Sequence, residues 1–128
     1  MDFLVVVNMK TVITNIEYKA GVLNISSETH PIGNELTFKE IHDLIIEYGA
    51  VNEIVFEDNN TDLNQIYMVA LTTKSFLPNL VLRLVSNKAN LNDLSMTNIL
   101  YPIPFTTLLM DGVLYKVVND KLVKHERI

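Results

Sequence analysis

The feature that most constrains the fold is an alternation of helix-like and strand-like segments between Thr37 and Gly112. Apolar periodicity and turn signals predict helices over 37–49, 61–77 and 90–100 and strands over 53–56, 80–85 and 105–110. Helices that alternate with strands favour right-handed β-α-β crossovers, which place the strands in one parallel sheet. We therefore expect an α/β fold built from β-α-β-α-β units with a mostly parallel sheet.

Two further segments predict β-hairpins outside these units. Residues 12–18 and 22–25 alternate apolar and polar side chains around a turn, and residues 113–118 and 121–125 flank a second turn at Asn119-Asp120. We expect these N- and C-terminal hairpins to add antiparallel edges. Residues 1–7 also predict a strand, because their short apolar run lacks the basic segment and cleavage site of a signal peptide.

The helix ends and the core are also marked in the sequence. Thr37 with Glu40 forms a capping-box pattern and Gly49 ends the first helix, while Thr61 or Asp62 caps the second. The predicted buried stripes comprise Phe38, Ile41, Leu44, Ile45 and Tyr48 on the first helix, and Leu63, Ile66, Tyr67, Ala70 and Leu71 on the second. The continuous apolar runs at 53–56 and 80–85 are typical of parallel strands covered on both faces.

Composition narrows the class of protein. A chain of 128 residues with 48% hydrophobic side chains is expected to form a single α/β domain over 1–128. A net charge of −5 argues against nucleic-acid binding, because basic side chains must neutralise phosphates. The absence of cysteine excludes disulfides and thiolate catalysis, and no run approaches the ~18 apolar residues of a membrane span. These counts favour a cytoplasmic protein.

The segments that follow parallel strands are where an α/β fold holds its ligands. Polar side chains occupy these positions, and they are the candidate ligand-binding residues: Glu57, Asp58, Asn59, Ser86, Asn87 and Asp111. No glycine-rich phosphate motif or G-x-S-x-G elbow occurs, and the three histidines lack metal-ligand spacing. We therefore expect no catalytic residue, no metal and no cofactor, although a buried carboxylate pair at the strand ends would permit acid–base chemistry.

Four stretches, 33–41, 54–59, 80–86 and 108–112, resemble motifs of the radical-SAM activating enzymes, which include the anaerobic ribonucleotide reductase activases. The first, GNELTFKEI, resembles the entry to that family's first helix, and the last, LLMDG, resembles its "I-D-G" strand end. The family's three cluster-binding cysteines are missing, and Asp58-Asn59 replaces the Gly-Gly pair that holds S-adenosylmethionine. The resemblance therefore implies a degenerate, cysteine-free fold reused without radical chemistry.

Together these patterns favour a non-catalytic protein-binding regulator or inhibitor, and the Lys-, Asn- and Ile-rich composition is typical of AT-rich phages or mobile elements. The expected partner is a protein. The C-terminal hairpin, 113–125, either pairs with a second copy in a homodimer or with a partner, or closes the sheet against the N-terminal strand. The alternative function is a small-ligand binder or cofactor-free enzyme with its site at the carboxyl ends of the parallel strands.

Overall fold

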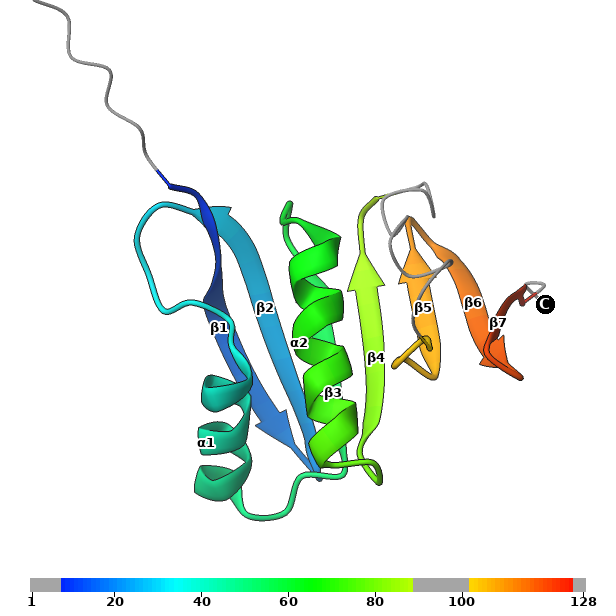
Figure 1. Cartoon of the computed structure of the whole chain (residues 1–128), viewed down its shortest axis with the longest axis horizontal. Helices are drawn as coiled ribbons and strands as arrows, with labels where there is room; N and C mark the ends of the chain where they lie inside the picture. The colour runs from blue at the N-terminus through cyan, green and yellow to red at the C-terminus, as the bar shows by residue number, and fades with distance from the viewer. Residues whose placement is uncertain (1–7, 89–101, 126–128) are drawn as a thin grey trace, which may run out of the picture.

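The computed structural model describes residues 8–88 and 102–125 (Figure 1). Its strands are β1 (Lys10–Lys19), β2 (Val22–His30), β3 (Glu53–Asp58), β4 (Val81–Ser86), β5 (Thr107–Met110), β6 (Val113–Val118) and β7 (Lys121–Lys124). Helix α1 (Phe38–Tyr48) connects β2 to β3, and helix α2 (Leu63–Phe76) connects β3 to β4. All seven strands form one sheet in which they lie in the same order as in the sequence.

Half of the strand pairings in this sheet are parallel. The pairings β2–β3, β3–β4 and β4–β5 are parallel, whereas β1–β2, β5–β6 and β6–β7 are antiparallel. The expected α/β fold is therefore confirmed in part, as a strand-dominated mixed sheet with the helices α1 and α2, and the expectation that the sheet is mostly parallel is wrong. The reason is that the terminal hairpins contribute as many pairings as the crossovers do.

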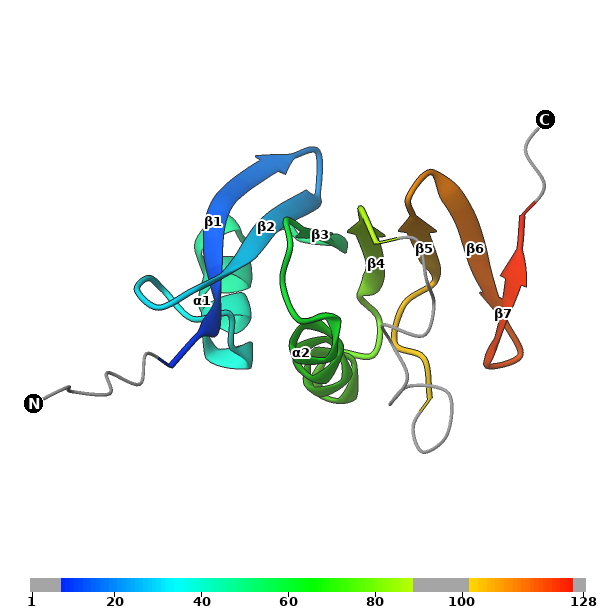
Figure 2. The same cartoon turned by 90° about the horizontal axis from the view of Figure 1, so that it is seen from above.

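Both helices pack on the same face of the sheet (Figure 2). Right-handed crossovers between successive neighbouring strands place their helices on one side, so the strand order explains this arrangement. Leu82 and Leu84 of β4 are buried beneath the helices, whereas Val81 and Val85 of the same strand are half-buried on the opposite face. The expectation that β3 and β4 are covered on both faces is therefore wrong for the part of the chain that the structure describes.

The first helix begins and ends where the sequence predicts. The Thr37 hydroxyl accepts a hydrogen bond from the backbone N–H of Glu40 at 3.3 Å, which satisfies one of the free donors of the first turn. Gly49 follows the helix with φ of 79°, and its N–H donates to the Ile45 carbonyl at 2.9 Å. A left-handed residue at this position favours glycine, which explains why α1 stops there.

The second helix is capped by Asp62 and not by Thr61. The Asp62 carboxylate accepts a hydrogen bond from the N–H of Asn64 at 3.0 Å. Four of the five residues of the predicted stripe are buried, and the fifth, Leu71, is half-buried. Thr73 is buried in addition, because its hydroxyl donates to the Val69 carbonyl at 2.8 Å and so needs no solvent.

Both predicted hairpins are present and add antiparallel edges. The turns Ala20-Gly21 and Asn119-Asp120 have positive φ at both positions, as two-residue hairpin turns require. Strand β7 lies at the edge opposite β1, so the C-terminal hairpin does not close the sheet against β1. The predicted strand at 1–7 and the predicted helix at 90–100 lie outside the described residues. Neither α1 nor α2 is long and apolar enough to cross a membrane, and no other described segment is such a helix.

Candidate functional site

The polar residues predicted at the strand ends lie together in one pocket of about 440 Å³. The parallel strands β3, β4 and β5 form it, because their carboxyl ends meet at the same edge of the sheet. Every predicted residue lines the pocket: Glu57, Asp58, Asn59, Ser86, Asn87 and Asp111. The side chains of Asn59, Asn87 and Asp111 are exposed, whereas those of Asp58 and Ser86 are buried. Binding of a ligand by these residues stays a prediction.

Asp58 is the most constrained of these residues, with 4% of its surface exposed. Its Oδ1 accepts a hydrogen bond from the N–H of Thr61 at 2.5 Å, and its Oδ2 accepts one from the Ser86 hydroxyl at 2.7 Å. The Lys88 ammonium donates to the Thr61 carbonyl, and the Lys88 N–H donates to Ser86 Oγ at 3.1 Å. Asp58 therefore ties the ends of β3 and β4 to the loop before α2, and both of its oxygens are engaged within the protein.

Glu57 points to the opposite side of β3 from Asp58, because successive strand residues face opposite sides of a sheet. It is half-buried, and its carboxylate accepts a hydrogen bond from the Ser26 hydroxyl at 2.9 Å. Acid–base catalysis by two carboxylates requires both of them within reach of the same reacting group. Glu57 and Asp58 face opposite sides of β3 and bond different serines, Ser26 and Ser86, and acid–base chemistry by a carboxylate pair at the strand ends stays a hypothesis.

The histidines contact only their local surroundings. His30 Nδ1 accepts a hydrogen bond from the Ile32 N–H at 3.1 Å, and the His42 ring lies 5.8 Å from the Phe38 ring between centroids. His125 is exposed at the end of β7. Within residues 8–88 and 102–125, no group of three His, Cys, Asp or Glu side chains is arranged to hold a metal.

A second hollow surface lies between α1 and α2, and we call it the interhelical groove. It consists of two adjoining hollows of about 380 and 390 Å³ that share Phe38, with Met68 in the first and Phe76 in the second. Phe38 and Phe76 stack with ring centroids 5.1 Å apart and an interplanar angle of 25°. Phe76 is 67% exposed and Met68 is 46% exposed. The groove therefore offers solvent a set of large apolar side chains.

The first hollow of the interhelical groove is acidic. Glu35 and Asp62 line it and the described residues that line it include no cation, whereas Lys39 lines the second hollow. On α1 the Lys39 ammonium lies 2.8 Å from the Asp43 carboxylate. The hydrogen bond from Lys39 to Asp43 and the attraction between their charges raise the pKa of Lys39. A molecule that approaches the first hollow therefore meets the carboxylates Glu35 and Asp62.

Sequence reasoning did not find this groove. It placed Phe38 on the buried stripe of α1 and did not single out Met68 or Phe76 as functional. Both of these residues lie off the buried stripe of α2 when successive residues are spaced by about 100° around the helix. Met68 and Phe76 are therefore the signal in the sequence. Large apolar side chains outside the buried stripe of a helix indicate an exposed apolar surface.

Comparisons with known proteins identify no relative: no family model, no curated protein and no solved structure matches this chain. The resemblance to the radical-SAM activating enzymes therefore stays a prediction. The residues at the strand ends do not fit that family's cofactors. The sequence contains no cysteine to hold an iron–sulfur cluster, and Asp58, which replaces the first glycine of the Gly-Gly pair, is bonded to Thr61 and Ser86.

Proposed function

We propose that this protein is a non-catalytic regulator or inhibitor that binds another protein in its interhelical groove. The observation that carries the proposal is the stacked pair Phe38 and Phe76, with Phe76 67% exposed in a hollow between two helices. Aromatic side chains in such positions are typical anchors of protein interfaces, because they supply a large apolar area for few rotatable bonds.

The groove best fits an amphipathic helix with basic residues along its border. A helix can lay its apolar face between two other helices and contact them through residues spaced three or four apart. Glu35 and Asp62 line the groove, and the whole chain has a net charge of −5. Lysine or arginine at the border of the bound helix would therefore be attracted, whereas glutamate would be repelled.

The polar pocket at the strand ends supports a catalytic function less well than the groove supports binding. Its buried carboxylate, Asp58, accepts hydrogen bonds at both oxygens and joins two strands to a loop. These two bonds and the 4% exposure of Asp58 fit a structural role, because the bonds satisfy a carboxylate that has little contact with solvent.

The test uses two synthetic amphipathic helices with the same apolar face, one bordered by lysine and the other by glutamate. Fluorescence anisotropy should show tighter binding of the lysine-bordered helix, and its affinity should fall as salt is added. Phe76→Ser should weaken that binding at least about tenfold, because it removes an anchor side chain. Ile46→Ser is the matched control, since Ile46 is 65% exposed on α1 but does not line the groove.

Two outcomes would contradict the proposal. One is equal affinity for the two helices, which would show that the acidic first hollow does not select the partner. The other is an equal loss of affinity in Phe76→Ser and Ile46→Ser, which would show that the groove is not the binding site.

The strand-end pocket favours a second candidate function, the binding of a small ligand that carries amino groups. Glu57 and Asp111 offer carboxylates, and Asn59 and Asn87 offer side-chain amides, around a volume of about 440 Å³. A short diamine is a suitable probe for titration calorimetry. Binding should be lost in Asp111→Asn, and binding that survives this change would place the diamine elsewhere.

A further inference from the structure

The sheet face opposite the helices, here called the uncovered face, carries apolar side chains from six strands. The strand registers place Val85, Leu109 and Leu114 side by side, and the other apolar side chains have polar or charged cross-strand neighbours: Val22, Val55, Val81, Val118 and Val123. Val118 and Val123 are 50% and 48% exposed, and the others are half-buried. Parallel strands such as β3 and β4 are usually covered on both faces. No described helix lies on this face, so β3 and β4 lack the second cover that such strands usually have.

Charges on the uncovered face are segregated between its two halves. The half formed by β1 to β3 carries four carboxylates and two cations: Glu17, Glu28, Glu53 and Glu57, with Lys10 and Lys19. The half formed by β4 to β7 carries the cations Arg83, Lys116 and Lys121. The two halves of one surface are thus complementary in charge.

We propose that two copies of this chain associate face to face through their uncovered faces, about a two-fold axis parallel to the strands and close to β4. This symmetry places β1–β3 of one copy over β5–β7 of the other and keeps each residue at its level along the strands. Glu17 then lies next to Lys116 and Lys121 of the other copy, while Lys19 lies opposite Lys121. A two-fold axis across the strands would instead bring like charges together. The interface is isologous and closed, because both copies contribute the same surface.

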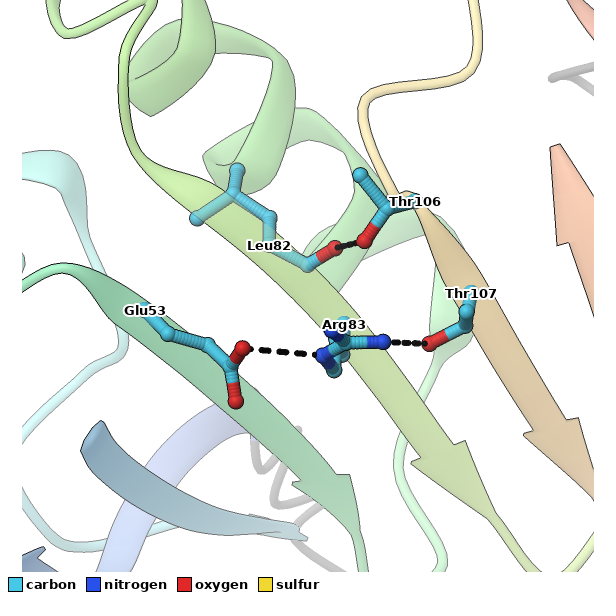
Figure 3. A network of polar contacts seen from close by, with 5 residues as sticks. All are labelled: Glu53, Leu82, Arg83, Thr106 and Thr107. Atoms are coloured by element: carbon cyan, nitrogen blue, oxygen red, sulfur yellow. Dashed lines mark hydrogen bonds and ion pairs between the residues drawn. The ribbon is translucent and has the colours of Figure 1, made fainter. Parts of the chain in front are cut away.

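The cation at the centre of the uncovered face is Arg83, and it already has a bonded carboxylate partner within its own chain. The proposed dimer therefore does not bury an unpaired charge there. Arg83 lies between β3 and β5, where its Nε donates to Glu53 Oε1 at 3.0 Å and its Nη1 donates to Thr107 Oγ1 at 2.9 Å (Figure 3). Burial of an unpaired charge is strongly unfavourable, whereas a cation with a bonded carboxylate beside it carries its own neutralising partner. Two Arg83 side chains near the axis therefore do not bring uncompensated charges together.

The uncovered face is also large enough for a specific dimer. Seven strands spaced about 4.8 Å apart, each about six residues long, give a surface of roughly 30 by 20 Å. The flat area of about 600 Å² per copy rises when side-chain relief is included, and standard interfaces bury about 800 Å² per partner. Sheets that pack in this way lie about 10 Å apart, as in a β-sandwich.

Other surfaces of the chain are poorer places for a second copy. Two helical sides would repel each other, because α1 exposes Glu47 and its Lys39 is already paired with Asp43. Antiparallel pairing of two β7 edges would place Lys121 beside Lys124 of the other copy, and like charges directly opposite are unfavourable. The uncovered face is the surface on which a second copy finds both apolar contacts and opposite charge.

Sedimentation of the full chain tests the proposal, with an expected mass of twice the 14.6 kDa of one chain. Two charge-reversed variants are compared: Glu17→Lys with Glu57→Lys, and Lys116→Glu with Lys121→Glu. Each variant alone should dimerise at least tenfold more weakly, whereas an equimolar mixture of the two should recover the dimer. Glu47→Lys, on the helical side, is the control and should leave the dimer unchanged.

A wild-type chain that stays monomeric at high micromolar concentration would overturn the proposal. So would a mixture of the two variants that stays monomeric while circular dichroism shows both to be folded. If either variant does not fold, Val123→Glu gives a second test, because this side chain is exposed in the single chain. Val123→Glu should be monomeric, and a dimer retained in that variant would also overturn the proposal.

Discussion

The two faces of the sheet carry similar apolar side chains in different surroundings. Leu108 and Leu109 are neighbours on β5, yet Leu108 is 1% exposed beneath the helical layer and Leu109 is half-buried on the uncovered face. The same contrast holds on β4 between Leu84 and Val85. The helices α1 and α2 cover one face of the sheet. No helix of the described residues covers the other face.

The two faces of the sheet are expected to affect different properties of the protein: the helical face its folding, and the uncovered face its association. Side chains beneath the helices contribute to the free energy of unfolding, because the core excludes water from them only in the folded chain. Side chains on the uncovered face keep part of their apolar area in water within a single copy. Their remaining area becomes available when another molecule covers them, so substitutions there should act on association more than on stability.

The largest expected effect is on the buried face. Leu108→Ala should lower the free energy of unfolding by about 2–5 kcal/mol, because it leaves a cavity under the helices. Leu109→Ala on the same strand should lower it by about 1 kcal/mol or less in the monomer. Urea denaturation at low protein concentration measures both values. Equal losses would show that the second face is covered as completely as the first.

An intermediate effect is expected at the strand ends. Asp58→Ala should cost about 1–3 kcal/mol, because the Thr61 N–H loses its acceptor and the Ser86 hydroxyl loses its carboxylate partner in a buried site. Asp111→Asn is the matched control in the same pocket. It should change stability little, because Asp111 is exposed and asparagine tolerates its φ of 47°. Thermal unfolding of the two variants makes the comparison. If Asp58→Ala is as stable as Asp111→Asn, the bonds of Asp58 do not hold the loop.

The smallest effect is expected at the ion pair on the uncovered face. Arg83 and Glu53 are 39% and 24% exposed, and pairs with this degree of solvent contact typically contribute about 0–1 kcal/mol. A double-mutant cycle with Glu53→Gln and Arg83→Met should give a coupling in that range which shrinks as salt is added. A coupling well above about 1 kcal/mol in the monomer would mean that this face is drier than its exposure indicates.

Much of the fold could be predicted because its signals are local. Alternation and turn residues predicted both hairpins, and the Thr37 cap and Gly49 predicted the limits of α1. The coverage of the sheet could not be predicted in this way. Apolar runs such as 80–85 show that a strand avoids water on both sides, but they do not say whether the same chain or another molecule provides the cover.

The strand-end pocket and the interhelical groove also differ in how far the sequence predicts them. Residues at the carboxyl ends of neighbouring parallel strands must lie close together, so the sequence predicted which polar residues meet in the pocket. It did not predict the direction of Glu57 relative to Asp58, although the two-residue period of a strand already contains that information. The interhelical groove depends on how α1 and α2 pack, which places Phe38 against Phe76 in a way that no local pattern specifies.

The order of the strands has a consequence for how the chain acquires its structure during synthesis. Each strand from β2 to β7 pairs with the strand made immediately before it, so none has to wait for a later part of the chain. Contacts between segments that are close in sequence have a small loop-closure cost and favour fast folding. The sheet can therefore grow one strand at a time as the ribosome releases the chain, and its growing edge is always the newest strand.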